Sequence, residues 1–508
     1  MSKRVIGSVF GSYFRARFRR IVYFIDKPFE VQEGVFSYLI KKTKDTLWGK
    51  KYDYKNIKSI EDFQKKVPLS TYEDIFPYIE KMMKGEKDIL WPGNTEWFAK
   101  SSGTTNNKSK FIPVSKESLK DCHFKGGKHA VSLYLKNFPN SKILQGQSLF
   151  IAGSLSPVIN GSNVKAGDVS AVLFKNSPKW MYSIRVPERE IALLPDWEEK
   201  ARLIVEKANT YNVASIYGTP TWVVILLEKI LKKNNTNSIF DIWPDLEVFF
   251  HGAVSFLPYK SIFSNLIVGK EINYVEVYNA TEGFFAVQDD YSLPGEMLLL
   301  LDVGIFYEFI PMDVFGTNNQ YAVTLEKVKL DKNYAMVIST NGGLMRYIIG
   351  DTIKFTSLKP FRIKITGRTK HFINTFGEEV IVENAVQAIH NACEETNAVI
   401  KSFTVGPQFM NENKSGRHEW IVEFIEAPND KDKFFTLVDE NIKEMNSDYE
   451  AKRKGDMILG KPIFHIAPEG TFYKWMKKRE KLGGQHKIPK LSNDRVYIDD
   501  ILDILKNG

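Results

Sequence analysis

Residues 101–113 hold the densest group of side chains in the sequence that could bind a chain of phosphates. The segment reads Ser-Ser-Gly-Thr-Thr-Asn-Asn-Lys-Ser-Lys-Phe-Ile-Pro. Its hydroxyls, backbone N–H groups and lysines would bring donors and positive charge to one place, as a triphosphate requires. The Walker A pattern, GxxxxGKS or GxxxxGKT, does not occur in the sequence, so a phosphate loop here would be of another kind. A surface loop rich in serine and threonine is the alternative.

Residues 278–283, which follow an apolar run, could contact a base, a phosphate and a metal ion. Tyr278 could stack on a base, and Thr281 could bind a phosphate oxygen. Glu282 could hold Mg²⁺, which prefers carboxylate and phosphate oxygens. Later in the chain, Asp351 could accept hydrogen bonds from the hydroxyls of a ribose. Taken alone, either segment would more often be an ordinary turn.

Lysines near the end of the chain are candidates for a group that offsets phosphate charge. Lys487 follows the glycine-containing segment Gly-Gly-Gln-His. Such a loop suits a residue that is delivered to an α-phosphate by domain closure. We predict Lys487 as the catalytic lysine and Lys481 as the second candidate, although both would also be ordinary surface charges.

Alternating helices and strands are predicted to position these groups. Apolar spacing indicates an amphipathic helix over 29–45 and another helix opened by Pro220. A capping box at Asp196 and Glu199 indicates the start of a third helix. Buried strands are predicted at 148–152, 213–217, 246–250 and 272–277. This alternation predicts an α/β fold.

The second half of the chain changes pattern twice. Residues 295–356 are rich in β-type segments and predict a smaller β subdomain. After Gly367 the pattern predicts an α+β domain, with helices at 378–392 and 431–453 and strands at 402–405, 420–425 and 463–466. A domain boundary near residue 367 follows from this change.

Composition and length fit an ordinary folded protein of more than one domain. The chain has 508 residues, of which 43% are hydrophobic and 26% are charged. Its net charge of +9 favours anionic ligands, but no nucleic-acid-binding motif supports a nucleic acid as partner. Two separated cysteines, Cys122 and Cys393, provide neither a disulfide framework nor a thiolate metal site. We therefore predict a cytoplasmic setting.

The first 24 residues combine arginines with aromatic residues and contain no signal-peptide pattern. No stretch of the sequence reaches the roughly 20 apolar residues of a membrane span. We predict a helix that packs its aromatic residues on the body of the protein. Contact with a membrane surface is the alternative.

The chemical segments resemble motifs of the adenylate-forming superfamily, in the same order along the chain. Residues 101–105 resemble its phosphate loop, and residues 278–283 resemble its Tyr-x-x-Ser/Thr-Glu-Gly motif. Residues 346–351 resemble its Tyr-Arg-x-Gly-Asp motif, with arginine and tyrosine exchanged. Residues 251–253, His-Gly-Ala, resemble its adenine segment, and the Gly-Arg-Thr-Lys at 367–370 resembles its hinge motif.

The nearest resemblance is to the plant auxin-responsive acyl-acid amido synthetases. These enzymes share a segment like residues 46–52, Thr-Leu-Trp-Gly-Lys-Lys-Tyr, which most acyl-CoA ligases lack. They also show a Gln-aromatic-Lys-x-Pro-Arg segment, which residues 485–490 resemble. The resemblance runs from about residue 28 to 505. The exchanged order of arginine and tyrosine at 346–347 is also typical of the plant enzymes.

The resemblance implies a role for each matching residue. Glu282 would hold Mg²⁺, Asp351 would bind the ribose of ATP, and Lys487 would offset charge at the α-phosphate. The other ATP-binding residues would be Ser101, Ser102, Gly103, Thr104, Thr105, Gly252, Ala253, Tyr278, Thr281 and Arg368. His251 would lie beside the adenine, and Lys370 would be the hinge residue. The domains would be 1–366 for ATP and the acid, a hinge at 367–371, and a mobile lid at 372–508.

The implied reaction has two steps. A carboxylic acid and Mg²⁺-ATP give an acyl-adenylate and pyrophosphate, and an amine, typically of an amino acid, then displaces AMP to form an amide. Thr221, Trp222 and Ile225 on the helix opened by Pro220 are predicted, from position alone, to line the acid site. We expect a monomer or a weak homo-oligomer.

Two other classes of function stay open from the sequence. One is an acyl-CoA ligase or a stand-alone adenylation enzyme that passes the acyl group to a thiol, although no carrier domain is evident. The other is a non-catalytic, nucleotide-binding regulatory protein, against which the presence of Glu282, Asp351 and Lys487 argues. The sequence does not identify the acid or the amine, because pocket shape determines this choice.

Overall fold

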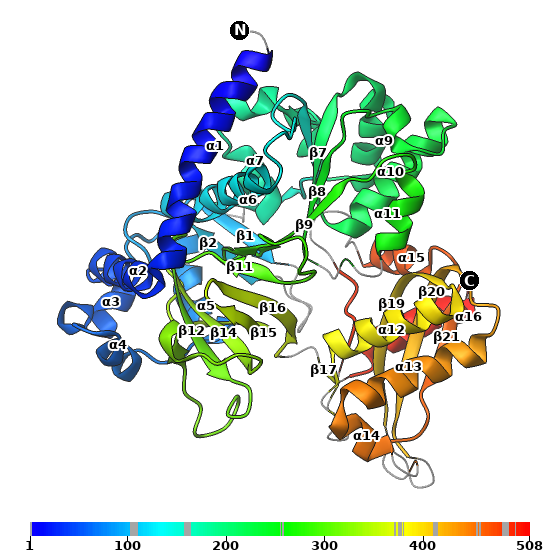
Figure 1. Cartoon of the computed structure of the whole chain (residues 1–508). Helices are drawn as coiled ribbons and strands as arrows, with labels where there is room; N and C mark the ends of the chain where they lie inside the picture. The colour runs from blue at the N-terminus through cyan, green and yellow to red at the C-terminus, as the bar shows by residue number, and fades with distance from the viewer. Residues whose placement is uncertain are drawn as a thin grey trace.

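The computed structural model describes residues 3–101, 110–156, 164–253, 256, 259–369, 372–373, 378, 380–409, 415–453, 456, 459–479, 487–492 and 494–507. A twelve-stranded sheet runs through the larger part of the molecule (Figure 1). Its strand order is β13-β12-β14-β15-β16-β11-β10-β9-β8-β7-β3-β6. One half of this sheet is parallel and the other half is antiparallel, and the two halves bring different groups to the candidate site.

The parallel half contains the strands that apolar runs predict. They are β3 (Gln147–Phe150), β6 (Arg185–Val186), β7 (Val213–Gly218), β8 (Val248–His251) and β9 (Asn273–Asn279). Each neighbouring pair among them is parallel. Their carboxyl ends therefore meet at one edge, where α/β sheets bind ligands. The four predicted strands are confirmed, whereas the two residues of β6 are too few to form a pattern.

Helices α9 (Trp197–Lys207), α10 (Pro220–Asn234) and α11 (Lys260–Leu266) accompany this half (Figure 1). Their apolar residues join one buried cluster with Leu149, Ile216 and Phe249 of the strands. The Asp196 side chain accepts a hydrogen bond from the Glu199 N–H at 2.7 Å, which confirms the predicted start of α9. Helix α10 begins at Pro220, as predicted.

The antiparallel half confirms the β-rich region predicted at 295–356. Its strands are β10 (Phe284–Val287), β11 (Met297–Leu299), β12 (Ile305–Pro311), β13 (Val323–Thr324), β14 (Asn333–Thr340), β15 (Tyr347–Leu358) and β16 (Phe361–Arg368). Strand β11 pairs with both β10 and β16. Hydrogen bonds therefore continue from the parallel half into this region, which extends the main sheet.

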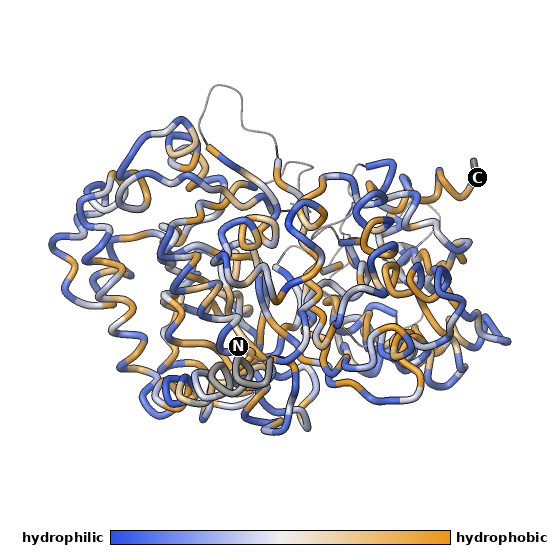
Figure 2. The backbone as a smooth tube through the Cα atoms, turned by 90° about the horizontal axis from the view of Figure 1, so that it is seen from above, coloured by the Kyte–Doolittle hydropathy of each residue, from blue (hydrophilic) through white to orange (hydrophobic). Residues whose placement is uncertain are grey.

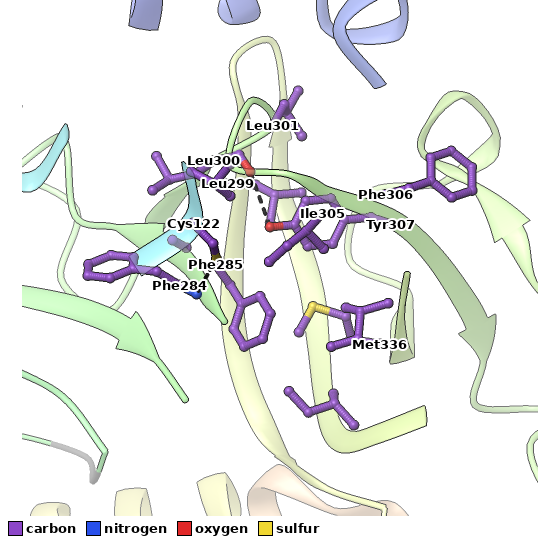
Figure 3. Close-up of a cluster of buried hydrophobic side chains, with 14 of the residues drawn as sticks. Cys122, Phe284, Phe285, Leu299, Leu300, Leu301, Ile305, Phe306, Tyr307 and Met336 are labelled. Carbon is purple, nitrogen blue, oxygen red and sulfur yellow. Dashed lines mark hydrogen bonds between the residues drawn. The ribbon is translucent and has the colours of Figure 1, made fainter. Parts of the chain in front are cut away.

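A buried apolar cluster fixes the turn between β9 and β10 (Figure 3). The Phe284 N–H donates to Cys122 Sγ at 3.3 Å, and the Tyr307 hydroxyl donates to the Leu300 carbonyl at 3.1 Å. Phe285 packs within the same cluster. Because Tyr278 and Glu282 lie on this strand and turn, the cluster holds their backbone in place.

A four-stranded sheet of order β2-β1-β5-β4 lies in the N-terminal half. Its strands are β1 (Trp97–Ser101), β2 (Lys110–Val114), β4 (Leu155–Ser156) and β5 (Lys165–Asp168). The helices of this half are α1 (Lys3–Asp26), α2 (Pro28–Thr43), α3 (Leu47–Lys51), α4 (Ile60–Lys66), α5 (Tyr72–Met83), α6 (Phe124–Asn137), α7 (Val169–Lys175) and α8 (Arg189–Ala192). Helix α1 lies against α6 (Figure 1) and buries Phe14 and Phe24, as predicted, although Tyr13 and Tyr23 are exposed.

The C-terminal part has its own three-stranded sheet, of order β19-β20-β21. Its strands are β19 (Val399–Gln408), β20 (Arg417–Glu426) and β21 (Ile463–Ala467), and a small pair consists of β17 (Phe372–Ile373) and β18 (Val380–Ile381). Its helices are α12 (Val382–Thr396), α13 (Lys431–Met445), α14 (Ser447–Arg453), α15 (Thr471–Lys478) and α16 (Val496–Asn507). This mixed α/β architecture, with a large N-terminal part and a smaller C-terminal part, confirms the predicted fold class.

The helix predicted over 431–453 is interrupted at Asn446. This residue has φ −139° and ψ 102°, which is extended backbone. Its side-chain oxygen accepts a hydrogen bond from the Tyr449 N–H at 2.8 Å, and this bond caps a new helix. The two helices α13 and α14 therefore replace one long one.

Hydrophobic and hydrophilic residues alternate along most of the chain (Figure 2). Accordingly, the described helices include none that is long and apolar enough to cross a membrane.

Candidate active site

Tyr278 of β9 forms a connected polar group with Asp351 of β15 and Arg368 of β16. The Tyr278 hydroxyl donates to Asp351 Oδ2 at 2.5 Å, and the Arg368 guanidinium contacts Asp351 Oδ1 at 2.7 Å. Asp351 lies opposite Arg368 in the β15–β16 pair, and opposite residues of antiparallel strands contact one another. A carboxylate has about four acceptor positions, so Asp351 retains capacity for the hydroxyls of a ribose.

The charges of this group stabilise one another. Burial, followed by the neighbouring Asp351 carboxylate, raises the pKa of Tyr278. The Tyr278 hydroxyl therefore stays protonated and donates. Asp351 raises the pKa of Arg368, whose side chain is 43% exposed, so the guanidinium is a fixed cation at the surface of the site.

Glu282 lies in the turn after β9, close enough to Asp351 and Arg368 to be affected by their charges. Burial raises its pKa first and repulsion by Asp351 raises it further, while the Glu282 backbone N–H, Arg368 and Lys110 oppose the shift. Thr281, beside it, is buried. The Glu282 carboxylate in this turn is therefore influenced by two cations, Arg368 and Lys110, and by a second carboxylate, Asp351.

The donor set fits a magnesium ion that takes most of its ligands from phosphates and water. Within the described ranges, no three or more His, Cys, Asp or Glu side chains are arranged to hold a metal ion. Glu282 and Asp351 repel one another, and a cation beside them would relieve that repulsion. Mg²⁺ is commonly held by one or two carboxylates together with substrate phosphates.

Lys487 reaches this group from the C-terminal part of the chain. Its pKa is lowered to about 8, first by burial of the amine and then by the Arg368 cation, while Asp351 and Glu282 oppose the shift. The residue keeps exposed surface. The structure thus brings Lys487 within electrostatic range of all three charged residues that the motifs predict.

The segment that carries Lys487 is attached to β19. The Thr404 hydroxyl donates to the Pro489 carbonyl at 2.6 Å, and the Val405 N–H donates to the Lys490 carbonyl at 2.9 Å. The Lys490 amine lies 4.3 Å from the centre of the Phe403 ring, and burial lowers its pKa to about 7. Lys490 thus anchors the segment, and Lys487 extends from it.

The predicted adenine segment lies at the carboxyl end of β8. A side chain at Gly252 would meet the Val277 carbonyl oxygen at 2.3 Å, so only glycine fits this close approach. Ala253 has φ +75°, a conformation that is rare for residues with a side chain. The His251 ring is buried and stacks on Phe256 at 4.2 Å, and burial lowers its pKa to about 3. His251 is therefore a neutral ring within the protein.

Several predicted residues lie outside the described part of the chain. These residues are Ser102, Gly103, Thr104, Thr105, Lys370 and Lys481. Ser101 ends β1 opposite Lys110 of β2, so the segment 102–109 begins and ends at paired positions. Lys110 in turn acts on the pKa of Glu282, which places the base of this segment near the carboxylate.

The three residues predicted to line the acid site lie on α10. Trp222 is 1% exposed, and its ring centre lies 4.7 Å from that of Trp197. Ile225 packs against the same buried cluster, and Thr221 lies in the first turn of the helix. Trp222 thus has a role in the core, and a contact of these three residues with the acid stays a prediction.

Two charged residues act differently from what their motif or the sequence suggests. Arg346, in the segment 346–351 that resembles the Tyr-Arg-x-Gly-Asp motif, forms a buried ion pair with Glu308 at 3.0 Å and donates to the Val67 carbonyl at 2.6 Å, so it supports the fold. Arg185 was not predicted at all, although it lies on the parallel half of the main sheet. Its neighbours, Phe150 and Tyr217, come from separate strands, and no local sequence signal could have revealed them.

Comparison with known proteins identifies the family of this chain. Sequence models of the GH3 family match the chain in three segments, the N-terminal domain at 17–272, the central domain at 298–368 and the C-terminal domain at 383–496. The chain belongs to the GH3 family. The predicted resemblance to the acyl-acid amido synthetases is thereby confirmed.

Named relatives cover nearly the whole length of this GH3 chain. Indole-3-acetic acid-amido synthetase GH3.3 of Arabidopsis thaliana is 21% identical over 91% of this chain and 89% of its own length. The 4-substituted benzoates-glutamate ligase GH3.12 of the same plant is 22% identical over 85% of this chain and 87% of its own.

Solved structures show the same fold. The GH3.15 acyl acid amido synthetase superposes with a TM-score of 0.77 at 18% identity, covering 93% of both chains. A 2-hydroxyisobutyryl-CoA ligase in the postadenylation state, in complex with 2-HIB-AMP, superposes with a TM-score of 0.60 at 12% identity over 94% of this chain and 92% of its own. The fold is therefore that of adenylate-forming enzymes.

Proposed function

We propose that this chain is an ATP-dependent acyl-acid amido synthetase, which adenylates a carboxylic acid and transfers the acyl group to the amine of an amino acid. The observation that carries the proposal is that Lys487, from the C-terminal part, lies within electrostatic range of Glu282, Asp351 and Arg368. These residues come from two parts of the chain and match the order of the family's motifs. Membership of the GH3 family supports the same activity.

In the first step, a carboxylate oxygen of the acid attacks the α-phosphorus of ATP, and the bond to pyrophosphate breaks. Lys487 would stabilise negative charge that develops on the α-phosphate oxygens, because it remains mostly cationic below its pKa of about 8. Asp351 would orient the ribose, and Ser101, Ser102, Gly103, Thr104 and Thr105 would bind the phosphates. Glu282 would hold Mg²⁺, which neutralises phosphate charge when bound.

In the second step, the amine attacks the acyl carbon, AMP leaves with the electron pair of the broken bond, and the nitrogen loses a proton to give the amide. Gly252 and Ala253 would lie against the adenine, with Tyr278 and Thr281 near the base and the α-phosphate. The relative named as a glutamate ligase supports an amino acid as the acceptor. We also propose the domain division at 367–371, because Lys487 must approach the site and leave it between the two steps.

The test is pyrophosphate release with Mg²⁺-ATP over a panel of aromatic and aliphatic acids, with and without a mixture of amino acids. We expect acid-dependent release that becomes faster with amino acids and falls at least 100-fold in Glu282→Ala. Glu326→Ala, which removes an exposed carboxylate elsewhere, is the matched control. Release that depends on coenzyme A and ignores amino acids would instead identify a thiol-acylating ligase. No release with any acid, together with ATP binding in calorimetry, would indicate a regulatory nucleotide binder.

We also propose that the protein works in the cytoplasm as a monomer or weak homo-oligomer. Cys122 and Cys393 are free thiols, as suits a reducing compartment. Sedimentation analysis at micromolar concentration tests the oligomeric state.

A further inference from the structure

Arg185, in the parallel half of the sheet, is a cation with no anionic partner among the residues that the structure describes. Within the described parts of the chain, its guanidinium makes one hydrogen bond, from Nη1 to the Ser177 hydroxyl at 2.7 Å, and no ion pair. Burial lowers its pKa to about 10, and interaction with Tyr217 and Tyr182 opposes this shift only in part. A guanidinium has five N–H donors, and even a partly buried charge without a partner is costly. The position is therefore suited to an anion supplied from outside.

A row of aromatic rings connects Arg185 with the predicted adenylation site. The guanidinium carbon lies 5.0 Å from the centre of the Phe150 ring, which lies 6.4 Å from the Tyr217 ring. Tyr217 stacks on Phe250 at 4.6 Å with an angle of 5° between the rings. Phe250 is the last residue but one of β8, so the row of rings ends next to the carboxyl end of that strand.

Strand register places the whole row on one face. Phe150, Tyr217 and Phe250 are directly opposite one another in β3, β7 and β8. Arg185 is opposite Ser148, two residues before Phe150. Strands lie about 4.8 Å apart, so the three steps from β8 to β6 span about 14 Å. Phe150, Tyr217 and Arg185 all keep some exposed surface, as residues that meet a ligand must.

We propose that Arg185 binds the carboxylate at the far end of a dicarboxylic acyl acid, whose reacting carboxylate lies at the α-phosphate, beyond the carboxyl ends of β8 and β9, and whose apolar middle contacts Phe150 and Tyr217. This assignment rests on the proposed function, because it takes the carboxyl ends of β8 and β9 as the adenylation site. Arginine suits the role because its planar fork of donors matches the two oxygens of a carboxylate. The stacked rings would exclude water around the pair and strengthen it.

The first experiment compares monocarboxylic and dicarboxylic acids of equal length, from hexanoate and hexanedioate to dodecanoate and dodecanedioate, in pyrophosphate release. We expect the wild type to favour the diacid at least 10-fold in kcat/KM at one length. Arg185→Met should lower kcat/KM for that diacid about 10- to 100-fold and change that for the monoacid by less than about twofold. Arg185→Lys should keep part of the preference.

The control variant is Ser177→Ala, which removes the only described hydrogen bond of Arg185 and keeps the cation. It should keep the preference for the diacid. If Arg185→Met lowers kcat/KM equally for both acids, or if the wild type prefers the monoacid at every length, the proposal is wrong. A second arm compares alanine with alaninamide as acceptor. If Arg185→Met loses only a preference for alanine over alaninamide, Arg185 binds the carboxylate of the amino acid and the proposal is wrong.

A binding measurement separates this proposal from the proposed function. Octanedioate at millimolar concentration should raise the melting temperature of the wild type more than octanoate does, and this difference should vanish in Arg185→Met. That result would support the carboxylate site even if no acid gave pyrophosphate release, in which case the proposed function would fail alone. If no diacid of any tested length raises the melting temperature more than its monoacid does, the proposed carboxylate site is wrong.

Discussion

Arg368 acts on two groups of the candidate site at once. It contacts Asp351 at 2.7 Å and it lowers the pKa of Lys487. Because arginine stays protonated at all accessible pH values, Lys487 is kept close to a permanent cation. The carboxylates of Asp351 and Glu282 only partly compensate. The charge of Lys487 therefore changes near neutral pH, and catalysis that depends on this charge should change with it.

The first prediction concerns the pH dependence of adenylation. Lys487 is cationic below its pKa of about 8 and loses its charge as the pH rises through that value. We expect kcat/KM for ATP, which reports on ionisations of the free enzyme, to fall above pH 8. Lys487→Arg should remove this fall, because arginine keeps its charge. Lys487→Ala should lower the rate about 100- to 1,000-fold.

Lys461→Ala, which removes an exposed lysine of the C-terminal part, is the control and should behave as the wild type. A wild-type profile of kcat/KM that is flat from pH 7 to 9 would exclude Lys487 as the titrating group. The measurement is initial-rate pyrophosphate release across that pH range at constant ionic strength.

Single residues of this site differ in how far the sequence predicts them. Glu282, Asp351 and Lys487 can be predicted because each lies in a local motif with its own chemistry. The pairing of Asp351 with both Tyr278 and Arg368 cannot, because it depends on the register between β15 and β16 and on the path of β9.

At the scale of elements, the segment that carries Lys487 pairs with β19 in one isolated parallel bridge, between Leu491 and Val405. The Ser492 N–H donates to the Val405 carbonyl at 3.0 Å, and the Thr404 hydroxyl donates to the Pro489 carbonyl at 2.6 Å. These bonds fix the backbone two and five residues from Lys487. The position of the catalytic lysine therefore depends on how firmly this segment is held.

The second prediction tests Thr404 as a positioning residue. Thr404→Val keeps the shape of the side chain but leaves the buried Pro489 carbonyl without its donor, which costs about 1 to 3 kcal/mol. We expect a lower melting temperature and a roughly 10-fold lower kcat for adenylation with little change in KM for ATP. Thr404→Ser restores the hydroxyl and should recover most of kcat. A loss of thermal stability without any loss of kcat would show that Thr404 is purely structural.

Helices and strands also differ in how clearly the local sequence predicts them. Strands β7 and β9 follow from short runs rich in β-branched and aromatic residues, whereas α6 contains Gly126 and Gly127, which weaken a helical pattern. The structure explains Gly126, because a side chain there would lie 2.5 Å from the Phe284 ring. A close contact between helix and strand thus obscures the helix in the sequence.

At the scale of the whole molecule, the C-terminal part docks on α9 and α10. Phe472 and Trp475 of α15 belong to the same buried cluster as Trp197 and Trp222. At the edge of this cluster, the Tyr473 hydroxyl donates to Glu198 of α9. The sequence does not predict this interface, because its two sides lie more than 200 residues apart and are each ordinary amphipathic helices. The same docking holds Lys487 against the Asp351 group.

The last prediction tests whether this interface favours adenylation. Tyr473→Phe removes the hydrogen bond to Glu198 and keeps the ring, at an expected cost of about 1 kcal/mol, or about fivefold in the docking equilibrium. We expect KM for ATP in adenylation to rise several-fold, while transfer of the acyl group from pre-formed acyl-adenylate to the amino acid is unchanged or faster. Single-turnover assays of the two steps measure both rates.

Lys229→Ala is the matched control for this interface, because Lys229 contacts the same Glu198 carboxylate at 3.2 Å from α10, on the same side of the interface. Both Lys229 and Glu198 are more than a third exposed at this contact, and exposed ion pairs contribute little. Lys229→Ala should therefore leave both steps near the wild-type rates. If the two variants slow adenylation equally, the effect comes from the environment of Glu198 and the docking argument is wrong. If only Tyr473→Phe does so, the hydrogen bond across the interface helps to hold Lys487 where the α-phosphate would lie.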